Sequence, residues 1–308
     1  MTSLLTISAI RDTDTAAVTE FINLNFEKIF NGMDIMPNSK PTYISNGKDF
    51  LKYLETAIFD LDIYRSYKEY LRKREDIGTK SKSAKLTAAK MLLSDLHSRY
   101  HVLPMDVTQG VKGFKITSGH TKDGLNSSEV EKVRTYIQGI TNDAKRTRLN
   151  AMFYLLAFQG LRQFEICNLE VEDVNFSDCT AMVRGKGSDD KQQIDLHPLT
   201  VKALREYSIT ANKKSGYFFT SEKGTSTGSK LTERGFRKIF DAIFDITEVD
   251  RTAHGFRHFF VTTLLEATNG NIGVVKQFSR HKSTAALVMY DDRKNKKSHL
   301  PMYHSTFN

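Results

Sequence analysis

The sequence predicts a mainly α-helical protein of two domains with a small β-sheet. Three observations support this fold class. Apolar residues recur at helical spacing along most of the chain, this periodicity fails over residues 105–126, and runs typical of β-strands occur around residues 180–196. With 308 residues, the chain is long enough for each of two domains to bury a core of its own.

The N-terminal part is predicted to be helical. Residues 1–45 are expected to form an arm or an extra helix, because "FINLNFEKIF" is helical and "NGMDIMPNSKPTYISNGK" resembles a loop. Residues 46–104 are expected to form a small bundle from "DFLKYLETAIF", "DIYRSYKEYLRKRED" and "SKSAKLTAAKMLLSDLHSRYHVL". Basic residues gather in this region between tyrosines, which favours a DNA-facing surface over a solvated face above a tyrosine-containing core. The residues expected to contact DNA here are Arg65, Lys68, Arg72, Lys73, Lys80, Lys82 and Lys85.

Residues 105–126 hold four glycines and are predicted to be a linker, and residues 127–308 form the second domain with a C-terminal tail. A helix should begin at Ser127 or Ser128, since Ser128 and Glu131 have the spacing of a capping box. "RLNAMFYLLAFQGLRQFEICNLE" predicts a central helix that is interrupted at Gly160. "TAMVRGKGSDDKQQIDLHP" predicts a hairpin of two strands, 180–184 and 192–196. Helices "LTVKALREYS", "TERGFRKIFDAIF" and "RHFFVTTLLEAT" and a short strand "GYFFTS" complete the prediction.

Composition restricts the possible functions. Lys and Arg number 45 against 36 Asp and Glu, so the formal net charge is +9, which either attracts polyanions or only keeps the surface solvated. No stretch approaches the roughly 20 apolar residues of a membrane span, so a soluble cytoplasmic protein is expected. Cys167 and Cys179 lack metal-ligand spacing and are expected to be buried, reduced thiols.

The stretch "TAHGFRHFFVTT" crowds potential cations into an apolar segment. A zinc site, a helical core with a polar edge and an anion clamp are the alternatives. His254 and His258 have the spacing of a zinc pair, but no Glu follows His254, and the intervening Arg257 would repel a metal ion. An anion clamp needs a second cation. Arg162 lies in a similarly apolar stretch, where Glu165 can pair with it, although this pair is also consistent with a simple salt bridge at a helix end.

Five motifs occur in an order and at a spacing that resemble the tyrosine recombinase (phage integrase) family: "GLRQFEICNLEVEDV", "RGKGSDD", "HGFRH", "SRH" and "MY". The resemblance covers residues 124–290 by motif and the N-terminal region by general character only. It implies a helical core-binding domain and a mixed α/β catalytic domain, which with the linker predict a C-shaped clamp around double-stranded DNA. The implied activity is site-specific DNA recombination through a 3′-phosphotyrosyl intermediate, without metal, ATP or other cofactor. The implied assembly is a homotetramer on two DNA sites. Without DNA, the protein is expected to be either this oligomer or a monomer.

The resemblance also implies roles for individual residues. Tyr290 matches the nucleophile, because it follows His281 by the nine residues that the family pattern requires. Arg280 departs from the pattern, which usually has glycine there. It is expected to face the DNA backbone, and a slightly different loop at this position is the alternative. The implied catalytic residues are Arg162, Lys186, His254, Arg257, His281 and Tyr290, with Glu165 orienting Arg162.

Two other functions remain open at this point. A type IB-like topoisomerase would use the same chemistry as a monomer and reseal the same strand. A catalytically silent relative would bind DNA without forming a covalent adduct.

Overall fold

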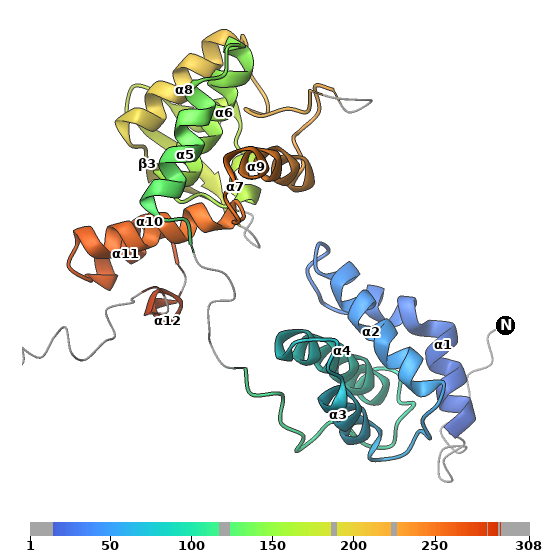
Figure 1. Cartoon of the computed structure of the whole chain (residues 1–308). Coiled ribbons are helices and arrows are strands. Elements are labelled where there is room, and N and C mark those ends of the chain that lie inside the picture. The colour runs from blue at the N-terminus through green and yellow to red at the C-terminus, as the bar shows by residue number, and fades with distance from the viewer. Residues whose placement is uncertain are drawn as a thin grey trace, which may run out of the picture. The chain divides into compact units, whose positions relative to one another are not determined.

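The computed structural model describes residues 15–116, 124–185, 190–222, 227–281, 283–288 and 290. The chain divides into two compact units, residues 1–117 and 118–308, and the division falls inside the predicted linker (Figure 1). The predicted fold class is confirmed: the described chain is mostly helical and holds one sheet of three strands. Among the described residues, no helix combines the length and the apolar character needed to cross a membrane.

The first unit is a bundle of four helices. In chain order these are α1 (Thr15–Gly32), α2 (Lys40–Leu54), α3 (Ile63–Lys73) and α4 (Thr79–Ser98). Helix α4 packs against the other three, and its buried positions are occupied by leucine and alanine. Helix α1 contributes Ile22, Phe26 and Ile29, which are at most 3% exposed, to the same core. The described part of the predicted arm therefore contains a helix of the bundle.

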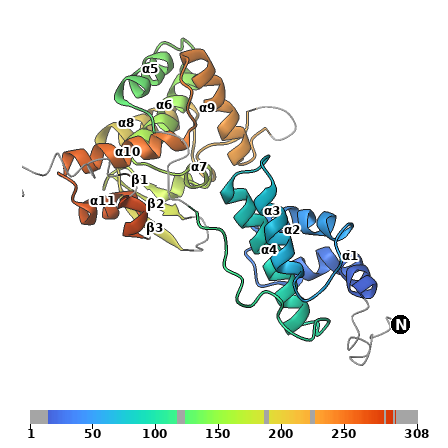
Figure 2. The same cartoon turned by 60° about the horizontal axis from the view of Figure 1, so that its bottom comes forward.

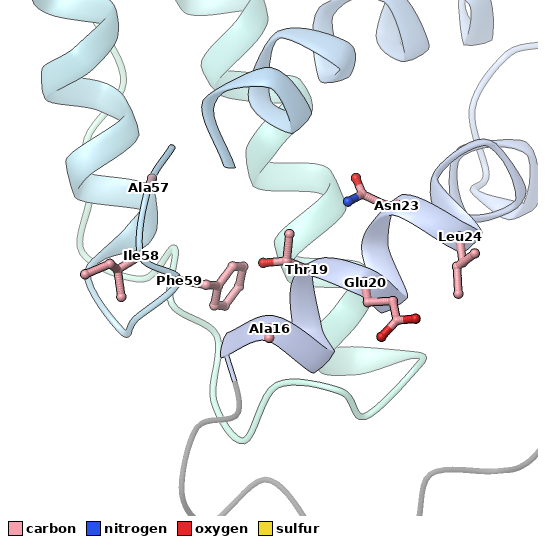
Figure 3. Close-up of a pocket in the computed structure, with 8 residues that line it drawn as sticks. All are labelled: Ala16, Thr19, Glu20, Asn23, Leu24, Ala57, Ile58 and Phe59. Atoms are coloured by element: carbon pink, nitrogen blue, oxygen red, sulfur yellow. The ribbon is translucent and has the colours of Figure 1, made fainter. Parts of the chain in front are cut away.

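A pocket of the first unit lies between the start of α1 and the segment 57–59 (Figure 3). Phe59 is buried beside it, whereas Leu24 and Ile58 at its edge are 77% and 79% exposed. All residues of this pocket belong to the first unit, whereas the predicted catalytic residues belong to the second.

The second unit is built around α6 (Asp143–Ala157), in which ten of fifteen residues are buried. The second half of α6, residues 149–157, is apolar on nearly all sides and needs neighbours on all of them. The helices that pack against α6 are α5 (Ser127–Gln138), α7 (Gln163–Cys167), α8 (Pro198–Thr210) and α10 (His254–Ala267). Helix α9 (Glu233–Thr247) lies against α5 and α7. The chain continues through α11 (Ile272–Ser279) to α12 (Thr284–Val288).

The sheet is antiparallel in the order β1–β2–β3 (Figure 2). Its strands are β1 (Val174–Asn175), β2 (Thr180–Arg184) and β3 (Lys191–Asp195), and a short 3-10 helix, η2 (Val171–Asp173), precedes β1. Arg184 pairs with Lys191, so the predicted hairpin is confirmed, with its second strand beginning one residue earlier than expected. The stretch "GYFFTS" forms only isolated bridges, from Tyr217 to Glu170 and from Thr220 to Lys230.

Three further local predictions were wrong. The expected loop over residues 31–48 contains the beginning of α2 at Lys40. Helix α5 does begin at Ser127, but its capping box joins Asn126 to Glu129, because the Asn126 side chain accepts the Glu129 N–H at 2.9 Å while Ser128 already lies inside the helix. Both cysteines are free, but only Cys167 is buried, and burial raises the pKa of its thiol to about 12. Cys179 is exposed at a positive φ of 56°, in the turn between β1 and β2.

Candidate active site

The turn between α6 and α7 positions the first arginine. Gly160 has a φ of +57°, and a Cβ atom there would lie 2.3 Å from the Phe260 ring, so both backbone conformation and space require glycine. The predicted interruption of the helix at this residue is confirmed. Arg162 follows as the N-cap of α7, with extended backbone. Its side chain is 35% exposed.

Glu165 holds Arg162 through backbone and side chain together. One carboxylate oxygen of Glu165 accepts the Arg162 backbone N–H at 2.8 Å, and the other accepts Arg162 Nη1 at 3.0 Å. The Glu165 side chain is 1% exposed. A carboxylate in the first turn of a helix satisfies an N–H group that has no intrahelical partner. The same contact leaves part of the guanidinium of Arg162 accessible from outside.

Arg257 lies on α10 and is 1% exposed. Its Nη1 donates to the Gly160 carbonyl and its Nη2 donates to the Ser279 carbonyl, both at 2.6 Å. Burial, followed by the positive charge of Arg162, lowers the pKa of Arg257 to about 10. The guanidinium therefore remains charged at neutral pH. A phosphate can reach it only after neighbouring side chains move.

His281 lies two residues beyond the end of α11. Its Nδ1 is 2.8 Å from the Ser279 hydroxyl, and its Nε2 is 3.4 Å from Arg257 Nη2. Burial, then the positive charges of Arg257 and Arg162, lower the pKa of His281 to about 4. The imidazole is therefore neutral at neutral pH.

Arg280 does not lie as expected for a side chain that faces the DNA backbone. It is 6% exposed, and its Nη2 donates to a Glu165 oxygen at 2.8 Å. Arg280 ends α11 in the left-handed conformation, with φ of 54° and ψ of 38°. Arg280 and Arg162 thus share one buried carboxylate.

Tyr290 is 9% exposed and packs with apolar residues of α10, α11 and α12. Its ring centroid is 5.7 Å from that of His281 and 4.8 Å from that of His258. Among the interactions that affect the Arg257 pKa is the electrostatic effect of Tyr290. The structure therefore places the predicted nucleophile beside the predicted histidine and near a predicted arginine.

His254 and Lys186 complete the set of predicted catalytic residues. His254 is the exposed first residue of α10, and its charge is the last of the effects that lower the pKa of His281. Lys186 lies outside the described residues. No group of three or more His, Cys, Asp or Glu side chains that could hold a metal ion occurs in the described part of the chain.

Three structural contributions to the site were missed from the sequence. The carbonyls of Gly160 and Ser279 hold Arg257, and a backbone acceptor leaves no residue-type signal. Among functional roles, His258 was considered only as half of a zinc pair, yet its ring contacts Tyr290. The signal that was available is its position one residue after Arg257, on the helix that faces Tyr290.

The basic residues of the first unit differ in how they are engaged. Lys85 is 17% exposed and donates to Asp49 at 2.8 Å, and Lys82 donates to the Arg72 carbonyl at 3.0 Å. These internal contacts were not expected for a DNA-facing surface. Lys68 lies over the Phe114 ring. The predicted contact residues with exposed side chains are Arg65, Arg72, Lys73 and Lys80.

Comparison with known proteins identifies the family. The model of the phage integrase family matches residues 125–297, which is more than half of the chain. A tyrosine recombinase of Synechocystis sp. is 24% identical over 277 residues, which are 84% of this chain and 87% of that protein. The tyrosine recombinase XerC of Leptospira interrogans is 25% identical over 287 residues, with 88% and 89% of the two chains covered.

Two solved structures share the fold. The XerH site-specific recombinase bound to its difH substrate, in a pre-cleavage complex, has a TM-score of 0.69 at 20% identity and covers 98% of this chain and 90% of its own. The Tn1549 transposon integrase in complex with transposon right end DNA has a TM-score of 0.66 at 15% identity, with 92% and 98% covered. The chain belongs to the phage integrase family and is a tyrosine-type site-specific recombinase.

Proposed function

We propose that this recombinase cleaves double-stranded DNA by attack of Tyr290 and rejoins the strands through a 3′-phosphotyrosyl intermediate. One observation carries the proposal: four residues from separate positions of the sequence lie close together in the second unit, namely Arg162, Arg257, His281 and Tyr290. The relatives that bind DNA in solved complexes support double-stranded DNA as the partner.

The two arginines provide the charge that the reaction needs. Attack on a phosphodiester increases the negative charge on the non-bridging oxygens, and fixed guanidinium groups stabilise that charge more in the transition state than in the substrate. Arg257 is fixed by two carbonyls and Arg162 by Glu165, so both guanidinium groups are held in place once the phosphate is bound. Their function is to bind the scissile phosphate.

The bond changes are balanced without an added reactant. The Tyr290 oxygen forms a bond to phosphorus as the bond from phosphorus to the 5′ oxygen breaks, and the phenol releases its proton to solvent water. A phenol with an ordinary pKa near 10 needs neighbouring cations to do this. The 5′ oxygen takes up a proton, and Lys186 is the proposed donor. The reverse reaction with a different 5′ hydroxyl joins new strands, and neither ATP nor a metal ion enters this scheme.

The two histidines are proposed to donate hydrogen bonds to the phosphate. A neutral imidazole keeps one N–H donor, so the lowered pKa of His281 does not remove this function. His254 is exposed at the first turn of α10, where an anion is also favoured by the helix dipole. The two residues would therefore approach the phosphate from different elements.

The first unit is proposed to contact the DNA backbone through Arg65, Arg72, Lys73 and Lys80, whose side chains are exposed. Phosphate contacts by such residues release counterions, so affinity for DNA should fall steeply with salt.

We propose a homotetramer on two DNA sites as the active assembly, because exchange between two duplexes requires four cleaved strands.

The function is tested with nicked duplexes that carry candidate sites and release a short fragment after cleavage, which traps a covalent complex. Wild-type protein should give a protein–DNA band on a denaturing gel, and Tyr290→Phe should give none. Tyr43→Phe is a matched control, because it removes the hydroxyl of a tyrosine in the first unit. Absence of any adduct on a duplex that the protein binds would overturn the proposal in favour of a silent DNA-binding relative.

A second experiment separates recombination from relaxation by a type IB-like enzyme. Two duplexes of different length, each with the site, are incubated with the protein, and products that join one to the other are scored. Recombination predicts joined products whose yield depends steeply on protein concentration. Relaxation of a supercoiled plasmid without any joined product would favour the topoisomerase.

A further inference from the structure

Arg280 has a backbone conformation that is unfavourable for its residue type. It ends α11 with φ of 54° and ψ of 38°, in the left-handed region. Glycine adopts this region freely and asparagine tolerates it, whereas other residues meet a steric cost at Cβ. An arginine at this position is therefore expected to compensate through contacts of its side chain.

The side chain of Arg280 makes such a contact. It is 6% exposed, and its Nη2 donates at 2.8 Å to the Oε2 atom of Glu165, which is 1% exposed. The two residues are 115 positions apart in the sequence. A charged group this deeply buried has to be paired to remain ionised. Each residue of this pair supplies the charge that the other needs.

Glu165 divides its two oxygens between separate tasks. Its Oε2 accepts Arg280 Nη2 and the Arg162 backbone N–H, both at 2.8 Å. Its Oε1 accepts Arg162 Nη1 at 3.0 Å. With Oε2 fixed by two donors, the carboxylate cannot rotate without breaking them. Its Oε1 therefore defines the direction of the Arg162 guanidinium, which is 35% exposed.

The neighbours of Arg280 belong to the same site. The carbonyl of Ser279 accepts Arg257 Nη2 at 2.6 Å, and His281 follows directly. Arg280 carries one of the positive charges that lower the pKa of His281, after burial and after the charges of Arg257 and Arg162. The turn that contains Arg280 thus connects to both arginines and to the histidine.

We propose that Arg280 is a positioning residue: through its buried ion pair with Glu165, it fixes the orientation in which Arg162 receives the scissile phosphate. Arg280 itself does not contact DNA. This inference rests on the proposed function, because it assigns to Arg162 the phosphate that the function requires.

The test uses three variants that differ in charge but fit the backbone to different degrees. Arg280→Gly and Arg280→Asn suit the left-handed conformation and remove the charge, and Arg280→Lys keeps the charge. Cleavage of the nicked duplex is measured at saturating protein, together with the Kd for the same duplex. We expect Arg280→Asn and Arg280→Gly to cleave on the order of 10- to 100-fold more slowly, with Kd changed by less than about 3-fold. Arg280→Lys should regain most of the rate.

Two outcomes would overturn the proposal. Wild-type cleavage rates in Arg280→Gly and Arg280→Asn would show that Arg162 needs no such support. A loss of affinity as large as the loss of rate, reduced at high salt, would indicate a direct DNA contact instead. If the neutral variants fail to fold, Arg280→Lys provides the test. A folded Arg280→Lys protein that gives no cleavage above the level without enzyme would contradict the proposal that the charge of residue 280 positions Arg162.

A readout without DNA distinguishes failure of this inference from failure of the proposed function. The pKa of His281, followed by NMR in the free protein, should rise from about 4 toward its usual value in Arg280→Asn, because one of the neighbouring positive charges is lost. An unchanged pKa in a folded variant would show that Arg280 is not coupled to the site. Absence of a covalent adduct with wild type would instead refute the proposed function alone.

Discussion

Replacement of Glu165 by glutamine perturbs the buried charges beneath the candidate active site while preserving the shape of the side chain. Glu165 is 1% exposed and accepts three hydrogen bonds, two from Arg162 and one from Arg280. Both of its oxygens face N–H donors. In either orientation of a glutamine amide, its NH₂ group would therefore meet another donor. The substitution also removes the negative charge that both arginines share.

The magnitude follows from the burial of the partners. Removal of one member of a buried ion pair costs about 3–5 kcal/mol, because the other charge is left without compensation. The Arg280 side chain is 6% exposed, so its charge would be left buried without a partner carboxylate. The Arg162 side chain, at 35%, is partly solvated, and pairs with such exposure contribute no more than about 1 kcal/mol. We therefore expect Glu165→Gln to lower the free energy of unfolding by about 3–4 kcal/mol, mostly through Arg280.

The assay is urea unfolding of the whole chain followed by far-UV circular dichroism. Because the two units need not unfold together, hydrogen exchange measured by mass spectrometry assigns the change to the second unit. Glu131→Gln is the matched control, since Glu131 is 59% exposed in its pair with Arg134. It should change stability by less than about 1 kcal/mol. The reasoning would be refuted if Glu165→Gln lost no more than this control.

Three further predictions follow from single contacts. Gly160→Ala should lower stability by about 2–4 kcal/mol in a thermal melt, because it adds left-handed strain and a Cβ atom 2.3 Å from the Phe260 ring. His281 should titrate near pH 4 in the free protein by NMR and at higher pH with DNA bound, because the phosphate offsets nearby positive charges. Lys73→Ala should reduce the salt slope of DNA binding by about 1, whereas Lys85→Ala should mainly destabilise the first unit.

Each of these has a contrary result. A Gly160→Ala protein that melts with wild type would show that the turn adapts freely. For His281, the unfolded state binds more protons than the folded state between the folded pKa of about 4 and the usual value of 6.5, so stability should fall as pH is lowered through that window. Stability that instead rises on acidification there would contradict the lowered pKa. Equal salt slopes of DNA binding for wild type and Lys73→Ala would show that Lys73 does not contact the DNA.

Much of the fold could be predicted because its signals are local. The hairpin follows from β-type runs on either side of a Gly-rich loop, and the end of α6 follows from Gly160. The capping box of α5 was misplaced because Asn126–Glu129 and Ser128–Glu131 have the same spacing, and only the extended backbone of Asn126 distinguishes them. Local patterns thus predict that an element exists more reliably than they predict its first residue.

The site was less accessible to sequence reasoning, because its contacts join distant segments. The pairing of Glu165 with Arg162 is a contact between residues three positions apart and could be predicted. The pairing of Glu165 with Arg280 spans 115 positions, and nothing local indicates it. The charge of Lys85 suggested a DNA contact, but Asp49, which engages it, comes from another helix. Ion pairs between side chains that are distant in the sequence are therefore identified only from the structure.

The central claim is that Tyr290 forms the bond to DNA, and the most direct measurement is to locate that bond. The covalent complex is trapped on a nicked duplex, the DNA is trimmed with nuclease, and tryptic peptides are analysed by mass spectrometry. The peptide of residues 283–293 contains Tyr290 as its single tyrosine. The account predicts a nucleotide-sized mass on this peptide, localised to Tyr290. The same mass on a peptide that holds another of the 12 tyrosines would contradict it.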